Sequence, residues 1–434
     1  MKLIFKKTVL LFSFLISFSM IISAQSIRNN ETLVSFRNNN MFIDSLMKKG
    51  IMTEPVTGLN YFTGYDYKTL YDWDQYFESI VQIYMGWPSI YMKNGVILFL
   101  KNQKENGLIA RSVPSFSWHD NEHVKPFLSQ ISLMIYNQYN EKDWILNNDM
   151  FTRLKKYLDY WLYDMDSNKN GLSEWMSAPH TGMDNQHERA GFWFDRCSEG
   201  VDLNCYLVRE TKAFAELAQL KGDKALAAKY REISENLKLR IQKEMWNPAD
   251  GFFYDLKVNP DKPLSKSAQE GSHMNTARNM GKFIPVKSVS AFTTLFAQVA
   301  TKQQAESLVF NYLFNPREFW SPYPVAVLSK SEPWYSTGYM PTDVGCSWRA
   351  NTWMPANYMI FHGLRYYGYD NMAKLIATQT NQLMKKSGSR EYYNAETGEG
   401  LGLNPFWGWS LLGYFFDIEA QINMDINEMK IVQK

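Results

Sequence analysis

The chain has 434 residues, of which 45% are hydrophobic and 21% charged, and its formal net charge is +2 at pH 7. It is long enough for a large buried core, and its scattered Lys and Arg residues form no basic stripe, which excludes a nucleic-acid-binding protein. The cysteines, Cys197, Cys205 and Cys346, are too few for a disulfide scaffold and fit no zinc pattern, although a Cys197–Cys205 bridge stays open. Aromatic residues make up 15% of the chain, which suits either an aromatic core or rings that stack on ligands.

The first 24 residues are typical of a secretory signal peptide. Three lysines begin the chain, an apolar run covers residues 8–22, and small residues end at Ala24. The run of about 15 residues is shorter than the roughly 20 that a membrane-spanning helix needs. We therefore expect cleavage after Ala24 and a secreted or periplasmic protein, in which residues 25–434 form a single domain without an internal linker.

Helical periodicity dominates wherever a pattern is clear. Apolar residues spaced three and four apart lie on both sides of the turn 221–223, so residues 204–245 are expected to form an antiparallel helical hairpin. An Asn/Asp-Gly-apolar turn recurs at Gly107, Gly171 and Gly251, with a looser relative at Gly398. The period is roughly 70 residues, the length of two helices with their connections. Six such units would fill the chain, so the sequence predicts an all-α fold, an (α/α)6 toroid of six helical hairpins.

Four segments combine acidic residues with Trp, Tyr, Arg or Asn, and most of them have the character of loops or helix ends. They are 71–77, 174–185, 348–353 and 390–400. Cleavage of a glycosidic bond needs one carboxyl group to protonate the leaving oxygen and a second to activate water or attack carbon, and enclosed acids near Trp and Tyr are the candidates. In a helical toroid, such connections line the mouth of the cavity.

These segments resemble glycoside hydrolase family 63, particularly its compact bacterial members related to mannosylglycerate and glucosylglycerate hydrolases, with trehalases as more distant relatives. The resemblance extends over about residues 61–416, and its most specific parts are Gly182-Met183-Asp184-Asn185, Trp348-Arg349-x-x-x-Trp353 and Glu391-Tyr392-Tyr393-Asn394. It implies the toroid fold, a carbohydrate substrate and hydrolysis of an α-glycosidic bond with inversion. Asp184 falls on the family's general acid and Glu391 on its general base. An Asx turn at Asp184 and a solvated or salt-bridged Glu391 are the alternatives.

The resemblance also implies a set of residues that bind the sugar. The expected substrate-binding residues are Tyr71, Trp73, Asp74, Gln130, Trp175, Asn185, Trp348, Arg349 and Trp353. Asp74 matches an acid that holds hydroxyl groups of the cleaved sugar, with a helix N-cap as the alternative. Arg349 can donate bidentate hydrogen bonds. Core packing is the alternative for one of the Trp residues at 348 and 353, and an ordinary helix-start residue for Gln130.

Two patterns suggest metal sites. Oxygen-bearing side chains alternate in Asp166-x-Asn168-x-Asn170-Gly171-Leu172-x-Glu174, which resembles the start of a calcium loop but lacks the distant bidentate Glu and also fits an ordinary turn. Structural calcium is therefore an open expectation, and no cofactor is expected for the chemistry. The motif His119-x-x-Glu122-His123 has the spacing of zinc peptidases, but Pro114 and Pro126 on either side predict a loop instead of the required helix.

Two other classes of protein stay open. One is a non-hydrolytic toroid enzyme, a sugar epimerase or polysaccharide lyase, although His180 and His187 beside Asp184 have no matching partner motif. The other is a sugar-binding protein that has lost catalysis. The chain has no room for the extra β-sandwich of the larger family members that trim glycoprotein glycans, which favours a small or modest α-linked, gluco- or manno-configured substrate. Residues 247–288 suggest either a lid or a surface excursion.

Overall fold

The computed structural model describes residues 31–191, 196–261, 281–338 and 346–422. The expected signal peptide lies outside these residues, as does the central part of the expected lid loop. Helices dominate the described residues, and each sheet has only two or three short strands. No helix in this part of the chain is long and apolar enough to cross a membrane.

The longer helices are α3 (Asp72–Met85), α4 (Ile90–Lys101), α5 (Leu128–Tyr139), α7 (Asn148–Asp159), α10 (Val201–Lys221), α11 (Lys224–Arg240), α15 (Met354–Tyr366) and α16 (Asp370–Ser387). Shorter helices are α2 (Met41–Met47), α6 (Asp143–Leu146), α8 (Ala178–Thr181), α9 (His187–Ala190), α13 (Thr293–Phe296), α14 (Lys302–Ser307) and α17 (Phe416–Ile422). Segments of 3-10 or π helix are η1 (Lys48–Gly50), η2 (Tyr160–Asp164), η3 (Ile241–Met245), η5 (Val289–Phe292), η6 (Leu308–Leu313) and η7 (Trp409–Tyr414). The strands are β1 (Ile51–Thr53), β2 (Asn60–Phe62), β3 (Leu70–Tyr71), β4 (Ser112–Val113), β5 (Ser198–Glu199), β6 (Trp246–Asn247), β7 (Phe252–Phe253), β8 (Asp255–Lys257), β9 (Phe283–Ile284), β10 (Tyr392–Tyr393) and β11 (Gly400–Leu401).

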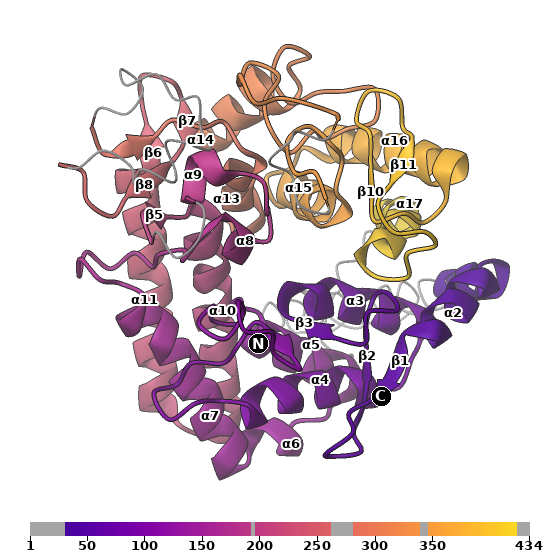
Figure 1. The fold of residues 1–434 in the computed structure, drawn as a ribbon, viewed down its shortest axis with the longest axis vertical. Coiled ribbons are helices and arrows are strands. Elements are labelled where there is room, and N and C mark those ends of the chain that lie inside the picture. Colours follow the sequence, from indigo (N-terminus) through magenta and orange to yellow (C-terminus); the bar gives the residue numbers. More distant parts are fainter. Residues whose placement is uncertain (1–30, 192–195, 262–280, 339–345, 423–434) are drawn as a thin grey trace, which may run out of the picture.

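Six helical elements form a closed inner ring. In order, α3, α5, α10, α13, α15 and η7 each contact the next, and η7 contacts α3, which closes the ring. The helices α4, α11 and α16 follow α3, α10 and α15 in sequence and pack against them in an outer layer (Figure 1). This arrangement confirms the predicted (α/α)6 toroid.

The α10–α11 hairpin was the clearest local prediction, and its turn explains why. Gly222 ends α10 in the left-handed conformation with φ 92°, which a residue with a Cβ adopts at a cost. Asp223 then caps α11 by accepting a hydrogen bond from the Leu226 backbone N–H. The same left-handed conformation occurs at Gly107, Gly171, Gly251 and Gly398, so the recurring turn reflects a shared backbone requirement.

A buried charge cluster fixes the chain just after the segment that carries Asp184. The guanidinium of Arg189 in α9 pairs with Asp202 at 2.9 Å and with Asp255 at 2.7 Å, and all three side chains are buried. Asp202 also accepts a hydrogen bond of 2.8 Å from the Trp175 indole N–H. Because removal of one member of a buried charge network leaves the others unpaired, this cluster ties α9 firmly to α10 and β8.

Candidate active site

Asp184 lies in the loop between α8 and α9, and a neighbouring segment holds this loop by side-chain contacts. The Cys346 thiol donates to Asp184 Oδ2 at 3.3 Å, and the Trp348 backbone N–H donates to Asn185 Oδ1 at 2.9 Å. The amide of Gln186 donates to the Trp348 carbonyl at 2.8 Å. Three consecutive residues are thus bound to residues 346–348, so the position of Asp184 depends on that segment.

Glu391 directly precedes β10 in a small hairpin. The Leu403 backbone N–H donates to Glu391 Oε2 at 3.0 Å, and the Trp409 indole donates to the Glu391 carbonyl at 2.9 Å. Burial raises the pKa of Glu391 to about 7, and the negative charge of Asp184 also raises it. Burial likewise raises the pKa of Asp184. The carboxyl group of Glu391 therefore lies within range of the Asp184 charge, although the two residues come from opposite halves of the chain.

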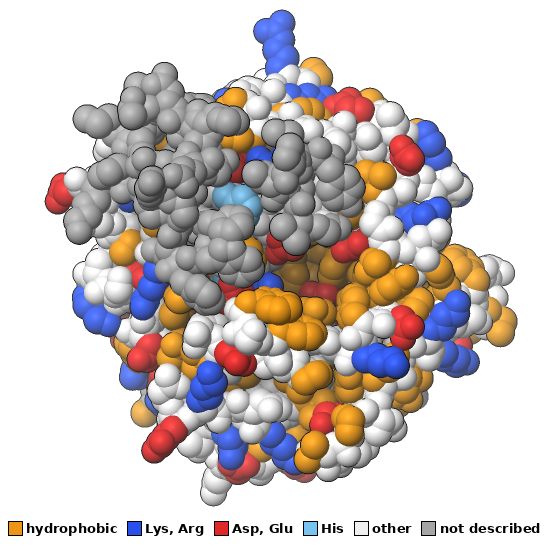
Figure 2. Space-filling view, viewed as in Figure 1, with side chains coloured by type: hydrophobic (Ala, Val, Ile, Leu, Met, Phe, Trp, Pro, Cys, Tyr) orange, Lys and Arg blue, Asp and Glu red, His pale blue; other side chains and the backbone are white. Residues whose placement is uncertain are grey.

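Asp74, in the first turn of α3, lies near Asp184, since the charges of both residues act on Tyr71. It is 6% exposed, and its pKa is raised by burial and by the nearby Asp72. Burial and the charges of Asp74 and Asp184 raise the pKa of Tyr71 to about 12. The N-cap of α3 is Tyr71, which rules out the N-cap alternative for Asp74. Over the centre of the ring, Figure 2 shows a hollow with hydrophobic side chains around it and acidic side chains at its edge.

Trp73, Trp348 and Trp353 form one continuous stack of rings with Tyr392. Ring centroids are 5.6 Å apart for Trp73 and Trp348, 3.7 Å for Trp348 and Trp353, and 4.5 Å for Trp353 and Tyr392. All four side chains are buried. The stack therefore joins three of the segments singled out in the sequence, and core packing describes the environment of Trp348 and Trp353.

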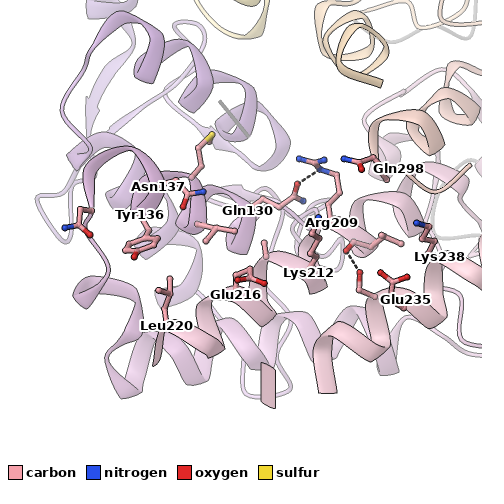
Figure 3. Close-up of a pocket in the computed structure, with 17 residues that line it drawn as sticks. Gln130, Tyr136, Asn137, Arg209, Lys212, Glu216, Leu220, Glu235, Lys238 and Gln298 are labelled. Atoms are coloured by element: carbon pink, nitrogen blue, oxygen red, sulfur yellow. Dashed lines mark hydrogen bonds between the residues drawn. The ribbon is translucent and has the colours of Figure 1, made fainter. Parts of the chain in front are cut away.

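Three other expected sugar-binding residues are engaged by the protein itself. Trp175 is fully buried, and its indole N–H donates a hydrogen bond to Asp202. Arg349 is 1% exposed and lies 3.7 Å from Glu188, whose pKa burial raises to about 7. Gln130 accepts a hydrogen bond of 3.1 Å from Arg209 and lines a separate cavity of about 620 Å³ between α5, α10 and α11, which contains none of the other expected site residues (Figure 3).

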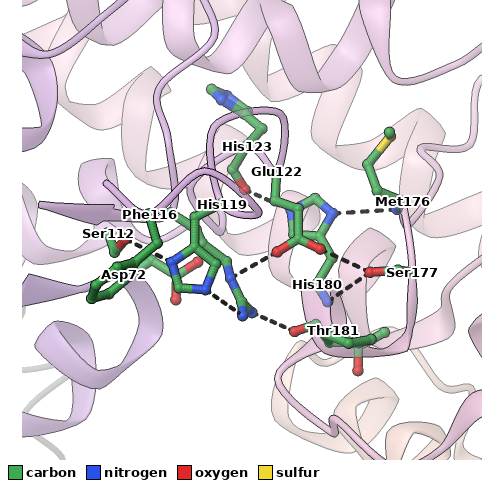
Figure 4. A network of polar contacts seen from close by, with 12 residues as sticks. Asp72, Ser112, Phe116, His119, Glu122, His123, Met176, Ser177, His180 and Thr181 are labelled. Atoms are coloured by element: carbon green, nitrogen blue, oxygen red, sulfur yellow. Dashed lines mark hydrogen bonds and ion pairs between the residues drawn. The ribbon is translucent and has the colours of Figure 1, made fainter. Parts of the chain in front are cut away.

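The sequence did not predict Arg111, which contacts Glu122 and His119, two residues of the polar network in Figure 4. Its Nε lies 2.8 Å from Glu122, its Nη2 lies 2.9 Å from His119 Nε2, and Nη1 donates to the Pro179 carbonyl. Burial lowers the pKa of Arg111, but the charges of Glu122 and Asp184 outweigh that effect and raise it. A lone Arg beside a short strand carries no sequence signal, because its relation to Pro179 and Asp184 depends on residues about 70 positions away in the chain.

The same network accounts for the histidine motif. His119 binds Ser112 and Arg111, whereas His123 accepts from the Ile109 N–H at 3.0 Å and faces the Tyr157 carbonyl. Burial lowers the pKa of both, to about 3 for His119 and about 4 for His123. The motif lies in a loop, as predicted, and its two imidazoles have different partners. None of the three cysteines, all of which lie in the described residues, forms a disulfide, so Cys197 and Cys205 are not bridged.

The expected calcium loop is held by its own hydrogen bonds. Asp166 accepts from the Asn170 and Gly171 backbone N–H groups, and Glu174 accepts from Ser167 and pairs with Arg196 at 2.7 Å. The side-chain amide nitrogens of Asn168 and Asn170, and not their oxygens, face Glu199 at 2.6 Å. Within the described residues, no three acidic, His or Cys side chains are placed to hold a metal. In this arrangement the carboxylate oxygens of Asp166 and Glu174 already have protein partners.

Calcium binding stays a prediction with a direct test. A bound ion would require both amides to turn their oxygens inward, and it would act on stability because the loop carries none of the expected catalytic groups. We expect removal of calcium with EDTA to lower the melting temperature while kcat is unchanged. An unchanged melting temperature on chelation and on calcium addition would eliminate the site.

The toroid and its pair of enclosed carboxyl groups define the class of protein, a glycoside hydrolase. Residues 71–410 match the family model described as the mannosylglycerate hydrolase MGH1-like glycoside hydrolase domain, and the chain belongs to this family.

Relatives and solved structures support this assignment. A mannosylglycerate hydrolase from Thermus thermophilus is 32% identical over 130 residues, 30% of this chain and 29% of that protein. The curated relatives are matched over less than half of their own length. The structure of a family 63 mannosylglycerate hydrolase from Thermus thermophilus superposes with a TM-score of 0.65 at 17% identity, covering 86% of this chain and 99% of that one. The neutral trehalase of Saccharomyces cerevisiae gives 0.61 at 17% identity, covering 85% and 76%. At such identities the structural likeness speaks for the fold.

Proposed function

We propose that this protein is a secreted, inverting α-glycosidase that hydrolyses an α-linked gluco- or manno-configured disaccharide, oligosaccharide or glycoside. Its main support is the position of Glu391 within range of the Asp184 charge, together with burial, which raises the pKa of both carboxyl groups. Two such carboxyl groups retain a proton at pH values where ordinary carboxyl groups have lost theirs. General acid and base catalysis at a glycosidic bond needs this property.

In the proposed reaction, protonated Asp184 gives its proton to the glycosidic oxygen as the bond to the leaving group breaks. Glu391 takes a proton from a water molecule that attacks the anomeric carbon from the opposite face. Asp74, enclosed on the same wall, binds hydroxyl groups of the cleaved sugar. Arg111 and the Cys346 thiol hold the charge and orientation of Asp184 between turnovers.

The alternatives from other classes have less support. An epimerase or lyase needs a His or Tyr base free to reach substrate, but His180 is fully buried between the Met176 N–H and the His123 carbonyl. A sugar-binding protein without catalysis gives no reason for two neighbouring carboxyl groups with raised pKa values. Turnover of a panel of α-linked disaccharides distinguishes these classes.

The stereochemistry of the first product tests the mechanism. Inverting carboxyl pairs are separated by roughly 6.5 to 9.5 Å and leave room for water, whereas retaining pairs are about 5 to 5.5 Å apart. We expect early-time NMR to detect the β-anomer released from an α-linked substrate, with no covalent adduct. Release of the α-anomer, or an adduct trapped on Glu391, would make Glu391 a nucleophile and overturn its role as a base.

A further inference from the structure

The loop between β4 and α5 carries an exposed tryptophan, Trp118, beside the partly buried Phe116. Trp118 is 50% exposed, and its ring stacks on Phe116 with 5.2 Å between centroids and an interplanar angle of 8°. The Trp residues of the central stack are, by contrast, buried. An indole left half in water forgoes much of the hydrophobic stabilisation available to it, and exposed aromatic groups commonly mark binding surfaces.

This pair adjoins the polar network beside Asp184. The His119 ring makes edge contacts with Phe116 at 5.4 Å, with Trp118 at 5.7 Å and with Tyr71 at 5.9 Å (Figure 4 shows Phe116 and His119). His119 is also bound to Arg111, and the charge of Asp184 acts on both Arg111 and Tyr71. His119 and Arg111 therefore connect the aromatic pair to Asp184, the proposed general acid.

A general acid marks the side of the cleaved bond from which the leaving group departs, because it protonates the leaving oxygen. A flat aromatic pair on that side offers a face to a sugar ring. It offers little to a short, charged leaving group such as glycerate. The cation best suited to a carboxylate is Arg111, whose guanidinium is already engaged by Glu122, His119 and the Pro179 carbonyl.

We propose that Phe116 and Trp118 form a stacking platform for a sugar ring in the leaving group, so that the substrate is an α-linked di- or oligosaccharide and not a glycosyl glycerate. This inference rests on the proposed function and adds the leaving-group subsite to it. Trp118 makes the contact, and Phe116 is a positioning residue that supports its ring from behind.

The test compares substrates with and without a sugar in the leaving group. Trp118→Ala and Trp118→Phe are assayed on α-linked glucose and mannose disaccharides and on the corresponding α-glycosyl fluorides, whose leaving group has no ring. Tyr163→Ala, an aromatic residue that is 48% exposed on η2, is the matched control. We expect Trp118→Ala to lower kcat/KM for the disaccharide on the order of tenfold, mainly through KM, with a change below about twofold for the fluoride. Trp118→Phe retains most of the activity, and Tyr163→Ala changes neither substrate.

Equal losses of kcat/KM in Trp118→Ala on the disaccharide and on the fluoride, or no loss on the disaccharide, would contradict the proposed stacking platform. It would also be overturned if the wild type turned over α-glycosyl glycerates more efficiently than any disaccharide. If the wild type hydrolyses none of these substrates, the proposed function fails. Calorimetric titration with maltotriose and mannotriose then tests the stacking platform independently of turnover. Binding weakened on the order of tenfold by Trp118→Ala then supports it, while equal affinity, or no binding to the wild type, rejects it.

Discussion

The pH dependence of hydrolysis follows from the enclosed carboxyl pair. An inverting pair is active with one proton, on the acid and not on the base. Burial, and to a lesser extent the charge of Asp184, raises the pKa of Glu391 to about 7, and burial raises that of Asp184. Because coupled groups titrate as a pair, we expect the last proton to leave near pH 7. The kcat/KM of the wild type should then fall about tenfold per pH unit on the alkaline side, to about 1% of its optimum at pH 9. If the last proton instead left at the ordinary Glu pKa of 4.5, kcat/KM would already have fallen to about 3% of its optimum at pH 6.

Removal of the general acid in Asp184→Asn should reverse the direction of the pH–rate profile. In Asp184→Asn, hydrolysis of an α-glycosyl fluoride needs only ionised Glu391, because fluoride departs with little proton assistance. Loss of the neighbouring charge also lowers the pKa of Glu391, while burial still raises it. The rate of this variant should rise with pH through a midpoint between 4.5 and about 7 and then stay level to pH 9. Glu391→Gln is the control and should hydrolyse neither the α-glycosyl fluoride nor an α-linked disaccharide. Stopped assays from pH 4 to 9 suffice, and an alkaline limb that persists in Asp184→Asn would refute the assignment of the two roles.

The remaining predictions concern the Cys346 thiol, which lowers the pKa of Asp184 by donating to its ionised form. Cys346→Ala removes that donor, so the pH–rate profile should shift to higher pH and kcat should fall several-fold. Cys346→Ser should restore both. If serine and alanine give the same shifted profile with unchanged melting temperatures, the thiol has no role beyond packing.

The sequence predicted what depends on local signals. The α10–α11 hairpin follows from apolar spacing and from the turn at Gly222, and repetition of such turns predicted the toroid. Asp74, Asp184 and Glu391 were found because each lies in a short motif. The charge of Asp184 acts on Glu391, and the charges of Asp74 and Asp184 both act on Tyr71, although the catalytic roles of Asp184 and Glu391 stay predictions.

Residue environments that depend on distant partners were not predictable. Arg111 has one neighbour at Pro179 and acts on Asp184, and neither relation leaves a pattern around position 111. Arg349 was expected to contact the sugar because Arg is a good donor, but its position is fixed by a fold that buries it beside Glu188. The type of a side chain limits what it can bind, whereas tertiary packing decides whether it reaches the substrate.

The two carboxyl groups have different hydrogen-bond partners, and the ring stack Trp348–Trp353–Tyr392 connects the two segments that hold them. The Asp184 loop is bound to residues 346–348, and Glu188 just beyond it lies beside Arg349. Glu391 is held from the other side by Leu403 and by Trp409 at the start of η7, which packs against α3 and α15. Substitutions at Cys346 or Arg111 should change the proton affinity of Asp184 more than the stereochemistry of hydrolysis, because they leave this ring stack in place.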